Sequence, residues 1–167
     1  MKNIKKINKK KEIKLTAKEK KKIKKEKKNY KNKNSVIIEA LKIVQEERNW
    51  ISDEIIIAIS KEIGVSYNDI EEIATFYSQI FRKPVGKHII KFCDSVVCYI
   101  NGYKNIQKKI EYHLKIKPGN TTKDNLFTLL PICCLGNCNF SPTIMIDKDI
   151  YGPVSTNSII QILDKYL

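Results

Sequence analysis

The sequence predicts an α+β protein in which a module of three short helices precedes a small mixed sheet packed with helices. Three observations carry this prediction. Apolar residues recur at helical spacing after residue 35, alternating β-forming residues follow at 87–93, and four cysteines come after predicted strands in two close pairs. A chain of 167 residues has room for one ordinary domain, or for a helical module and one compact domain. We therefore expect three segments, at residues 1–33, 34–84 and 85–167.

The first segment, residues 1–33, is dominated by lysine. It holds 17 Lys against 3 Glu and so carries the whole formal net charge of +14, whereas the rest of the chain is neutral. A low-complexity run of this kind buries too little apolar surface to offset the entropy of ordering. Its lysines can attract the phosphates of RNA or anionic lipid, but we expect a disordered or only transiently helical tail that is solvated and inert. Its removal should leave the fold unchanged.

The chain carries no apolar run of about 18 residues, so no transmembrane helix is expected. The N-terminus also lacks the apolar core of a secretory signal peptide, which indicates a cytoplasmic protein. In that compartment five cysteines, an odd number, favour metal ligation or thiol chemistry over a disulfide framework.

Three helices are expected in the second segment. Residues 35–48 have apolar side chains at helical spacing, and Ser52 is a natural N-cap for a helix through about Ile63. Ser66 is followed three positions later by an acidic residue, which resembles a capping box and predicts a short helix at 67–75. These three helices form the predicted N-terminal bundle.

An aromatic segment closes this module before a boundary at residue 84. Phe76, Tyr77 and Phe81 are candidates for a docking surface, because aromatic side chains anchor protein interfaces. Packing between the two modules is an equally good interpretation of the same residues.

The third segment alternates strands and helices, which predicts a small mixed sheet with helices packed on it. The expected elements are a strand at 87–93, a helix at about 99–113, a strand at 126–130, a hairpin with strands at 143–146 and 150–151, and a final helix at about 155–166.

Four cysteines are spaced as Cys93-x4-Cys98 and Cys134-x3-Cys138, each pair placed just after a predicted strand. Four thiolates brought together by folding can hold a [2Fe–2S] cluster or a structural zinc ion. Gly136 tolerates a left-handed backbone, which lets the second loop wrap closely around a metal centre. The spacing favours the cluster, while zinc and thiol–disulfide chemistry stay open as alternatives.

Other cofactor sites are not visible in the sequence. His88 and His113 are not paired with cysteines, which argues against a Rieske centre. No glycine-rich nucleotide motif, zinc-protease motif or serine elbow is present, so a nucleotide would be bound by another subunit. Cys133, the fifth thiol, is expected to be a small buried apolar residue, with ligand swapping for Cys134 as the alternative.

Taken together, these motifs resemble the E subunit of bacterial NADH:quinone oxidoreductase, respiratory complex I. The resemblance covers about residues 35–167. Its elements are Ile73-Ala-Thr-Phe-Tyr-Ser-Gln79, both cysteine pairs with 35 residues between them, and Ser141-Pro142, which lies where thioredoxin-like folds often have a cis proline.

This resemblance implies a thioredoxin-like [2Fe–2S] ferredoxin domain behind the helical module, with Cys93, Cys98, Cys134 and Cys138 as ligands of one cluster. It also implies a component of an oxidoreductase with no substrate pocket of its own. A partner subunit would bind FMN and NADH, and the cluster would exchange electrons with that flavin. The chain would lie at the inner face of the energy-conserving membrane, held there only through the complex, with no nucleic acid as partner.

Two other functions remain open on the sequence. The equivalent diaphorase subunit of an NAD-linked hydrogenase or formate dehydrogenase would have the same cysteines. A zinc-stabilised nucleic-acid-binding protein would use the basic tail and would be colourless.

Overall fold

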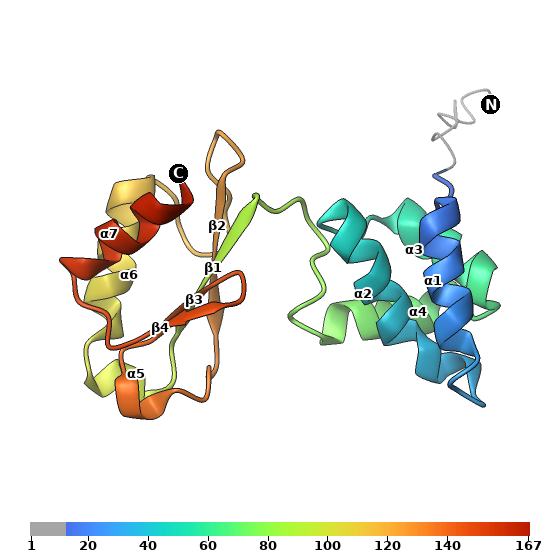
Figure 1. The fold of residues 1–167 in the computed structure, drawn as a ribbon, viewed down its shortest axis with the longest axis horizontal. Helices are drawn as coiled ribbons and strands as arrows, with labels where there is room; N and C mark the ends of the chain where they lie inside the picture. The colour runs from blue at the N-terminus through green and yellow to red at the C-terminus, as the bar shows by residue number, and fades with distance from the viewer. Residues whose placement is uncertain (1–12) are drawn as a thin grey trace, which may run out of the picture. The chain divides into compact units, whose positions relative to one another are not determined.

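The computed structural model describes residues 13–167, which form two compact units (Figure 1). The division lies between Pro84 and Val85, which is the predicted position. In the described part of the chain, none of the helices is both long and apolar enough to cross a membrane.

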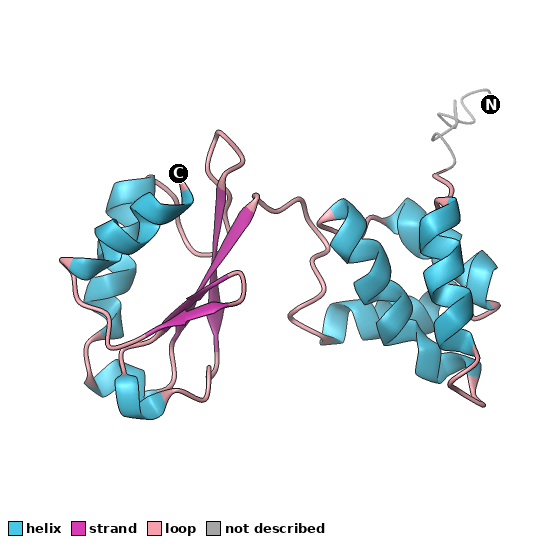
Figure 2. Cartoon of the chain, in the orientation of Figure 1, coloured by secondary structure: helices cyan, strands magenta, loops and turns pink. Residues whose placement is uncertain are grey.

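The first unit is entirely helical (Figure 2). Its helices are α1 (Ala17–Lys27), the 3-10 turn η1 (Lys33–Val36), α2 (Ile37–Arg48), α3 (Asp53–Ile63) and α4 (Tyr67–Phe76). The predicted caps are present, since the Ser52 hydroxyl accepts the Ile55 amide and the Ser66 hydroxyl accepts the Asp69 amide. The core between the helices is mostly isoleucine and includes Ile23, Ile37, Leu41, Ile56, Ile59, Ile63 and Ile70.

Helix α1 shows that the prediction of disorder for residues 1–33 is wrong for residues 13–33. Residues 1–12 lie outside the described part. The helix starts with a complete capping box, in which the Thr16 hydroxyl accepts the Glu19 amide at 3.2 Å and the Glu19 carboxylate accepts the Thr16 amide at 2.6 Å. Leu15 and Ile23 are buried in the core of the unit. One apolar side chain within this lysine-rich helix and one just before it therefore anchor it in the core.

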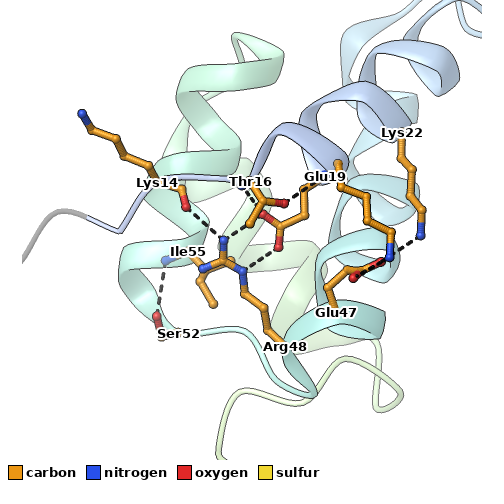
Figure 3. Close-up of polar contacts among 9 residues, drawn as sticks. Lys14, Thr16, Glu19, Lys22, Glu47, Arg48, Ser52 and Ile55 are labelled. Carbon is orange, nitrogen blue, oxygen red and sulfur yellow. Dashed lines mark hydrogen bonds and ion pairs between the residues drawn. The ribbon is translucent and has the colours of Figure 1, made fainter.

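An ion pair fixes α1 to α2 (Figure 3). The Arg48 guanidinium donates to both carboxylate oxygens of Glu19, at 2.6 and 2.8 Å, and to the Lys14 carbonyl at 3.0 Å. The Glu19 side chain is 0% exposed. Burial alone raises its pKa, but the hydrogen bonds from Arg48 and from the Thr16 amide outweigh burial and hold the Glu19 pKa below its usual value.

Lysines of α1 also pair with acidic residues of α2 and α3. Lys18 and Lys22 both reach the Glu47 carboxylate at 3.0 Å, and Lys20 lies 3.6 Å from Glu62. Part of the charge assigned to an inert tail therefore belongs to the folded unit.

The second unit contains a four-stranded mixed sheet in the order β2-β1-β3-β4. Its strands are β1 (His88–Cys93), β2 (Phe127–Ile132), β3 (Ile144–Ile146) and β4 (Asp149–Tyr151). Strands β1 and β2 are parallel, and the other two neighbouring pairs are antiparallel. Figures 1 and 2 show α6 (Tyr103–Leu114) and α7 (Ser158–Leu163) together on one side of the sheet, with the 3-10 turn η3 (Asp164–Tyr166) at the C-terminus.

Two helix boundaries differ from the prediction. The helix expected at 99–113 is two helices, α5 (Val96–Ile100) and α6, separated by Gly102 with a φ of 84°. The last helix begins at Ser158 because Ser155 stays in the preceding turn, where its hydroxyl accepts the Ser158 amide at 3.0 Å.

Candidate metal centre

Two loops at one edge of the sheet carry the four predicted ligands. Cys93 ends β1 and Cys98 lies in α5, whereas Cys134 follows β2 and Cys138 begins the 3-10 turn η2 (Cys138–Phe140). Because β1 and β2 are parallel, with Cys93 opposite Ile132, both loops leave the sheet at the same edge.

The thiols interact as two pairs. Cys93 is near enough to Cys98, and Cys134 near enough to Cys138, to raise the pKa of the neighbouring thiol, and the charge of Cys138 acts on Cys98 as well. Within residues 13–167, no three His, Cys, Asp or Glu side chains already surround a single metal position. The first pair is buried, the second is exposed, and all of the cysteines are free thiols.

The surroundings of the thiols determine their protonation. Burial, followed by the hydrogen bond with Cys93, raises the pKa of Cys98 to about 11, against the opposing effect of the Thr143 amide. The contact with Cys134 raises the pKa of Cys138. Two neighbouring thiols cannot both ionise readily unless a cation lies between them. A bound metal ion reverses this preference, because a coordinating thiol is deprotonated.

The donor set fits a centre bound through sulfur. Thiolates select zinc or iron–sulfur clusters among biological metals. Gly136 has a φ of 73°, and its amide donates to the Cys134 sulfur at 3.3 Å, so the second loop turns a backbone donor toward a thiol.

The family of the chain follows from comparison with known proteins. The sequence profile of the thioredoxin-like [2Fe–2S] ferredoxins matches residues 23–167. The chain belongs to this family. The predicted thioredoxin-like ferredoxin fold is thereby confirmed, and the family supports an iron–sulfur cluster as cofactor.

Curated relatives of this ferredoxin cover nearly its whole length. The E subunit of the NADH-quinone oxidoreductase of Buchnera aphidicola subsp. Acyrthosiphon pisum (strain APS) is 54% identical over 154 residues, which is 92% of this chain and 95% of the relative. The protein of the same name from Escherichia coli (strain K12) is 50% identical over 152 residues, covering 91% and 92%. The predicted resemblance to this subunit is confirmed at this level.

Solved structures support the fold alone. An NAD+-reducing [NiFe]-hydrogenase in the H2-reduced state matches with a TM-score of 0.67 and 21% identity, over 78% of this chain and 22% of the hydrogenase chain. The air-oxidized state matches with a TM-score of 0.60 and 22% identity, over 66% and 19%. This chain thus spans about a fifth of the hydrogenase chain that it matches.

Apolar side chains lie exposed on the elements that hold the ferredoxin's cysteines. Val96, Tyr99 and Ile100 are on α5 with Cys98, and Phe140 is on η2 with Cys138. We call these four residues the thiol-side patch.

Two further residues that the sequence singled out, His88 and Cys133, lie outside the predicted ligand set. His88 contacts Asp147 at 2.7 Å and packs against Tyr166, so it is a structural residue of the ferredoxin. Cys133 is exposed, and the prediction that it is buried is wrong, because it lies beyond the end of β2. Its carbonyl accepts the Cys93 thiol at 3.9 Å.

Sequence reasoning missed the polar contacts that join the two cysteine loops. Asn101 donates to the Ser141 hydroxyl at 2.6 Å, and the buried Thr143 lies between the loops. No motif marks these residues, because their partners come from other elements. A signal did exist for α1, since Thr16-x-x-Glu19 is a capping-box pattern.

Proposed function

We propose that this chain is the electron-transfer E subunit of an NADH-quinone oxidoreductase, and that Cys93, Cys98, Cys134 and Cys138 hold one [2Fe–2S] cluster. The observation that carries the proposal is the placement of four thiols on two loops that leave the parallel strands β1 and β2 at the same edge of the sheet. A [2Fe–2S] cluster has two protein ligands on each iron, so each pair supplies the ligands of one iron.

The chain's own residues prepare this site for redox chemistry. When bound, the cluster accepts and returns one electron. The Gly136 amide donates to the Cys134 sulfur at 3.3 Å, and the Thr143 amide lowers the pKa of Cys98 against the effect of burial, so both favour negative charge on sulfur. The buried pair excludes water from one side, while the exposed pair opens the other side toward a partner.

The partner in this proposal is a flavin subunit that binds FMN and NADH. The chain has no nucleotide-binding glycine motif, so the nucleotide is placed on that partner. The thiol-side patch is the surface that suits its docking, because a partner seated there lies beside the exposed thiols. In the helical unit, Phe76 is 80% exposed and Tyr77 packs edge-on against it, which suits a second contact with the complex.

In this proposal the protein lies in the cytoplasm, at the inner face of the energy-conserving membrane and attached through the complex. The alternative host is an NAD-linked hydrogenase or formate dehydrogenase. The hydrogenase likeness is limited to the fold, and it adds no weight to that alternative. The subunits that copurify with the chain from its native host separate the two.

The cluster is tested on protein purified without oxygen, by iron and sulfide analysis and by EPR of the reduced sample. We expect two irons and two sulfides per chain in a red-brown protein. Zinc, or no metal, at the thiols would contradict the proposal.

Single Cys→Ser variants then test each ligand. Replacement of any one of the four should abolish the cluster or alter its EPR spectrum, because each thiolate would be bound directly to iron. Cys133→Ser is the matched control and should leave the spectrum unaltered. An unaltered spectrum in one of the four variants would remove that residue from the ligand set.

A further inference from the structure

Thr143 contacts both cysteine loops although it is not a ligand. It directly precedes β3 and is only 2% exposed. Its carbonyl accepts the Cys93 amide at 3.1 Å, and its own amide is near enough to the Cys98 thiol to oppose the rise of that thiol's pKa. The backbone of this one residue thus bonds one member of the buried pair and lies near the other.

The side chain of Thr143 holds the other loop. Its hydroxyl has one hydrogen, which it donates to the Phe140 carbonyl at 2.9 Å or the Asn137 carbonyl at 3.3 Å. Those two carbonyls flank Cys138 in the exposed pair. Any residue could supply the backbone contacts, but only a hydroxyl supplies this one.

The 3-10 turn η2, which contains Cys138 and Phe140, is also packed closely against Gly152. A Cβ added at Gly152 would collide with the Phe140 carbonyl oxygen and lie 3.0 Å from the Thr143 hydroxyl. The absence of a side chain at Gly152 therefore lets the turn approach β4 and the threonine. A second connection runs from Asn101, just after the Cys98 helix, to Ser141, just after the Cys138 turn.

We propose that Thr143 is a positioning residue of the cluster, whose hydroxyl fixes the Cys138 turn against the strand and helix that carry Cys93 and Cys98. This inference rests on the proposed function. With the hydroxyl present, the two thiol pairs keep a constant separation and the backbone donors stay aimed at sulfur. Without it, the exposed pair loses its fixed place relative to the buried pair. Cluster retention and reduction potential both depend on such outer contacts.

The test compares Thr143→Val with Thr143→Ser in the full chain. Valine keeps the shape of threonine without the hydroxyl, and serine keeps the hydroxyl. We expect Thr143→Val to lose iron to a chelator about tenfold faster than the wild type and to show a shifted midpoint potential and EPR spectrum. Thr143→Ser should behave as the wild type in all three measurements.

Thr128→Val is the matched control. Thr128 is also a threonine with 2% exposure, in the same unit, but its hydroxyl contacts Gly86 and Thr121 and reaches neither cysteine loop. Its loss should leave the chelation rate, potential and EPR spectrum unchanged. Equal changes in the Thr128 and Thr143 variants would show a general loss of stability and would overturn the inference.

Further outcomes separate a failure of this inference from a failure of the proposed function. Wild-type cluster behaviour in Thr143→Val overturns the inference while leaving the proposed function intact, whereas a wild-type protein without iron and sulfide overturns the proposed function itself. If Thr143→Val does not fold, Thr143→Ala replaces it beside Thr143→Ser, because both lack the methyl group and differ only in the hydroxyl. Equal chelation rates and potentials in that pair would reject the role of the hydroxyl.

Discussion

The two units of this protein stabilise their structures in different ways. The helical unit is held by an isoleucine core, side-chain caps on its helices and a buried ion pair between Glu19 and Arg48. The ferredoxin domain has a core of its own, but it leaves thiols and apolar side chains exposed on the loops at one edge of its sheet. The first unit is thus held by packing, caps and ion pairs, whereas the proposed function assigns a metal centre and a partner to the exposed thiols and apolar side chains of the second.

Removal of residues 1–33 should have the largest effect, a strong destabilisation of the helical unit that leaves the ferredoxin domain folded. The deletion takes Leu15 and Ile23 from the core and leaves Arg48 without its carboxylate. We expect the helical unit to lose about 4 kcal/mol or more of its free energy of unfolding, measured by urea denaturation with circular dichroism. The cluster's absorbance should persist, because the ferredoxin domain has a separate core.

Deletion of residues 1–12 alone is the control for this experiment, since it keeps every contact described for α1. If the longer deletion has no effect on the unfolding midpoint, α1 is dispensable and the expectation of an inert tail is right after all.

Replacement of Glu19 by Gln should have a smaller effect on the same unit. The amide keeps the shape of the side chain but leaves the Arg48 guanidinium without a charged partner. We expect a loss of roughly 2–3 kcal/mol in the free energy of unfolding. Glu47→Gln is the matched control and should cost much less, because its pairs with Lys18 and Lys22 lie at the surface. Equal losses in the two variants would contradict a special role for the buried pair.

The smallest effect should be that of pH: the free energy of unfolding should fall at acid pH in the helical unit and at alkaline pH in the ferredoxin domain. The lowered pKa of Glu19 makes its contribution complete above the usual glutamate pKa, and the contribution is lost as the pH falls through the lowered value. In the ferredoxin domain, burial and then hydrogen bonds with Tyr151 and Asp149 raise the pKa of Tyr166. That contribution is complete below the usual tyrosine pKa and is lost as the pH rises through the raised value.

Urea denaturation of the helical unit at acid pH, and of the ferredoxin domain at alkaline pH, measures the two responses. Glu19→Gln should flatten the first and Tyr166→Phe the second. A steep acid loss that persists in Glu19→Gln would assign the response to another group.

Local patterns account for most of what could be predicted. The caps at Ser52 and Ser66 depend on neighbours three residues away, so they are visible in the sequence. Alternation of residues located β1, a run of β-forming apolar residues located β2, and cysteine spacing located both loops. Two predictions were wrong: that the lysine-rich segment containing α1 is disordered, and that Cys133 is buried. Both relied on the kinds of residue nearby, whereas order and burial depend on contacts in the folded chain.

The helices α2 to α4, the strands, and the grouping of the cysteines along the chain all follow from the amino-acid sequence, because each depends on residues a few positions apart. Other features emerge only when the chain is folded. Helix α1 docks through Ile23 and Glu19, the two cysteine loops come together at one edge of the sheet, and Thr143 joins them. Burial and hydrogen bonding join groups tens of residues apart, and the spacing of residues along the chain does not record these contacts.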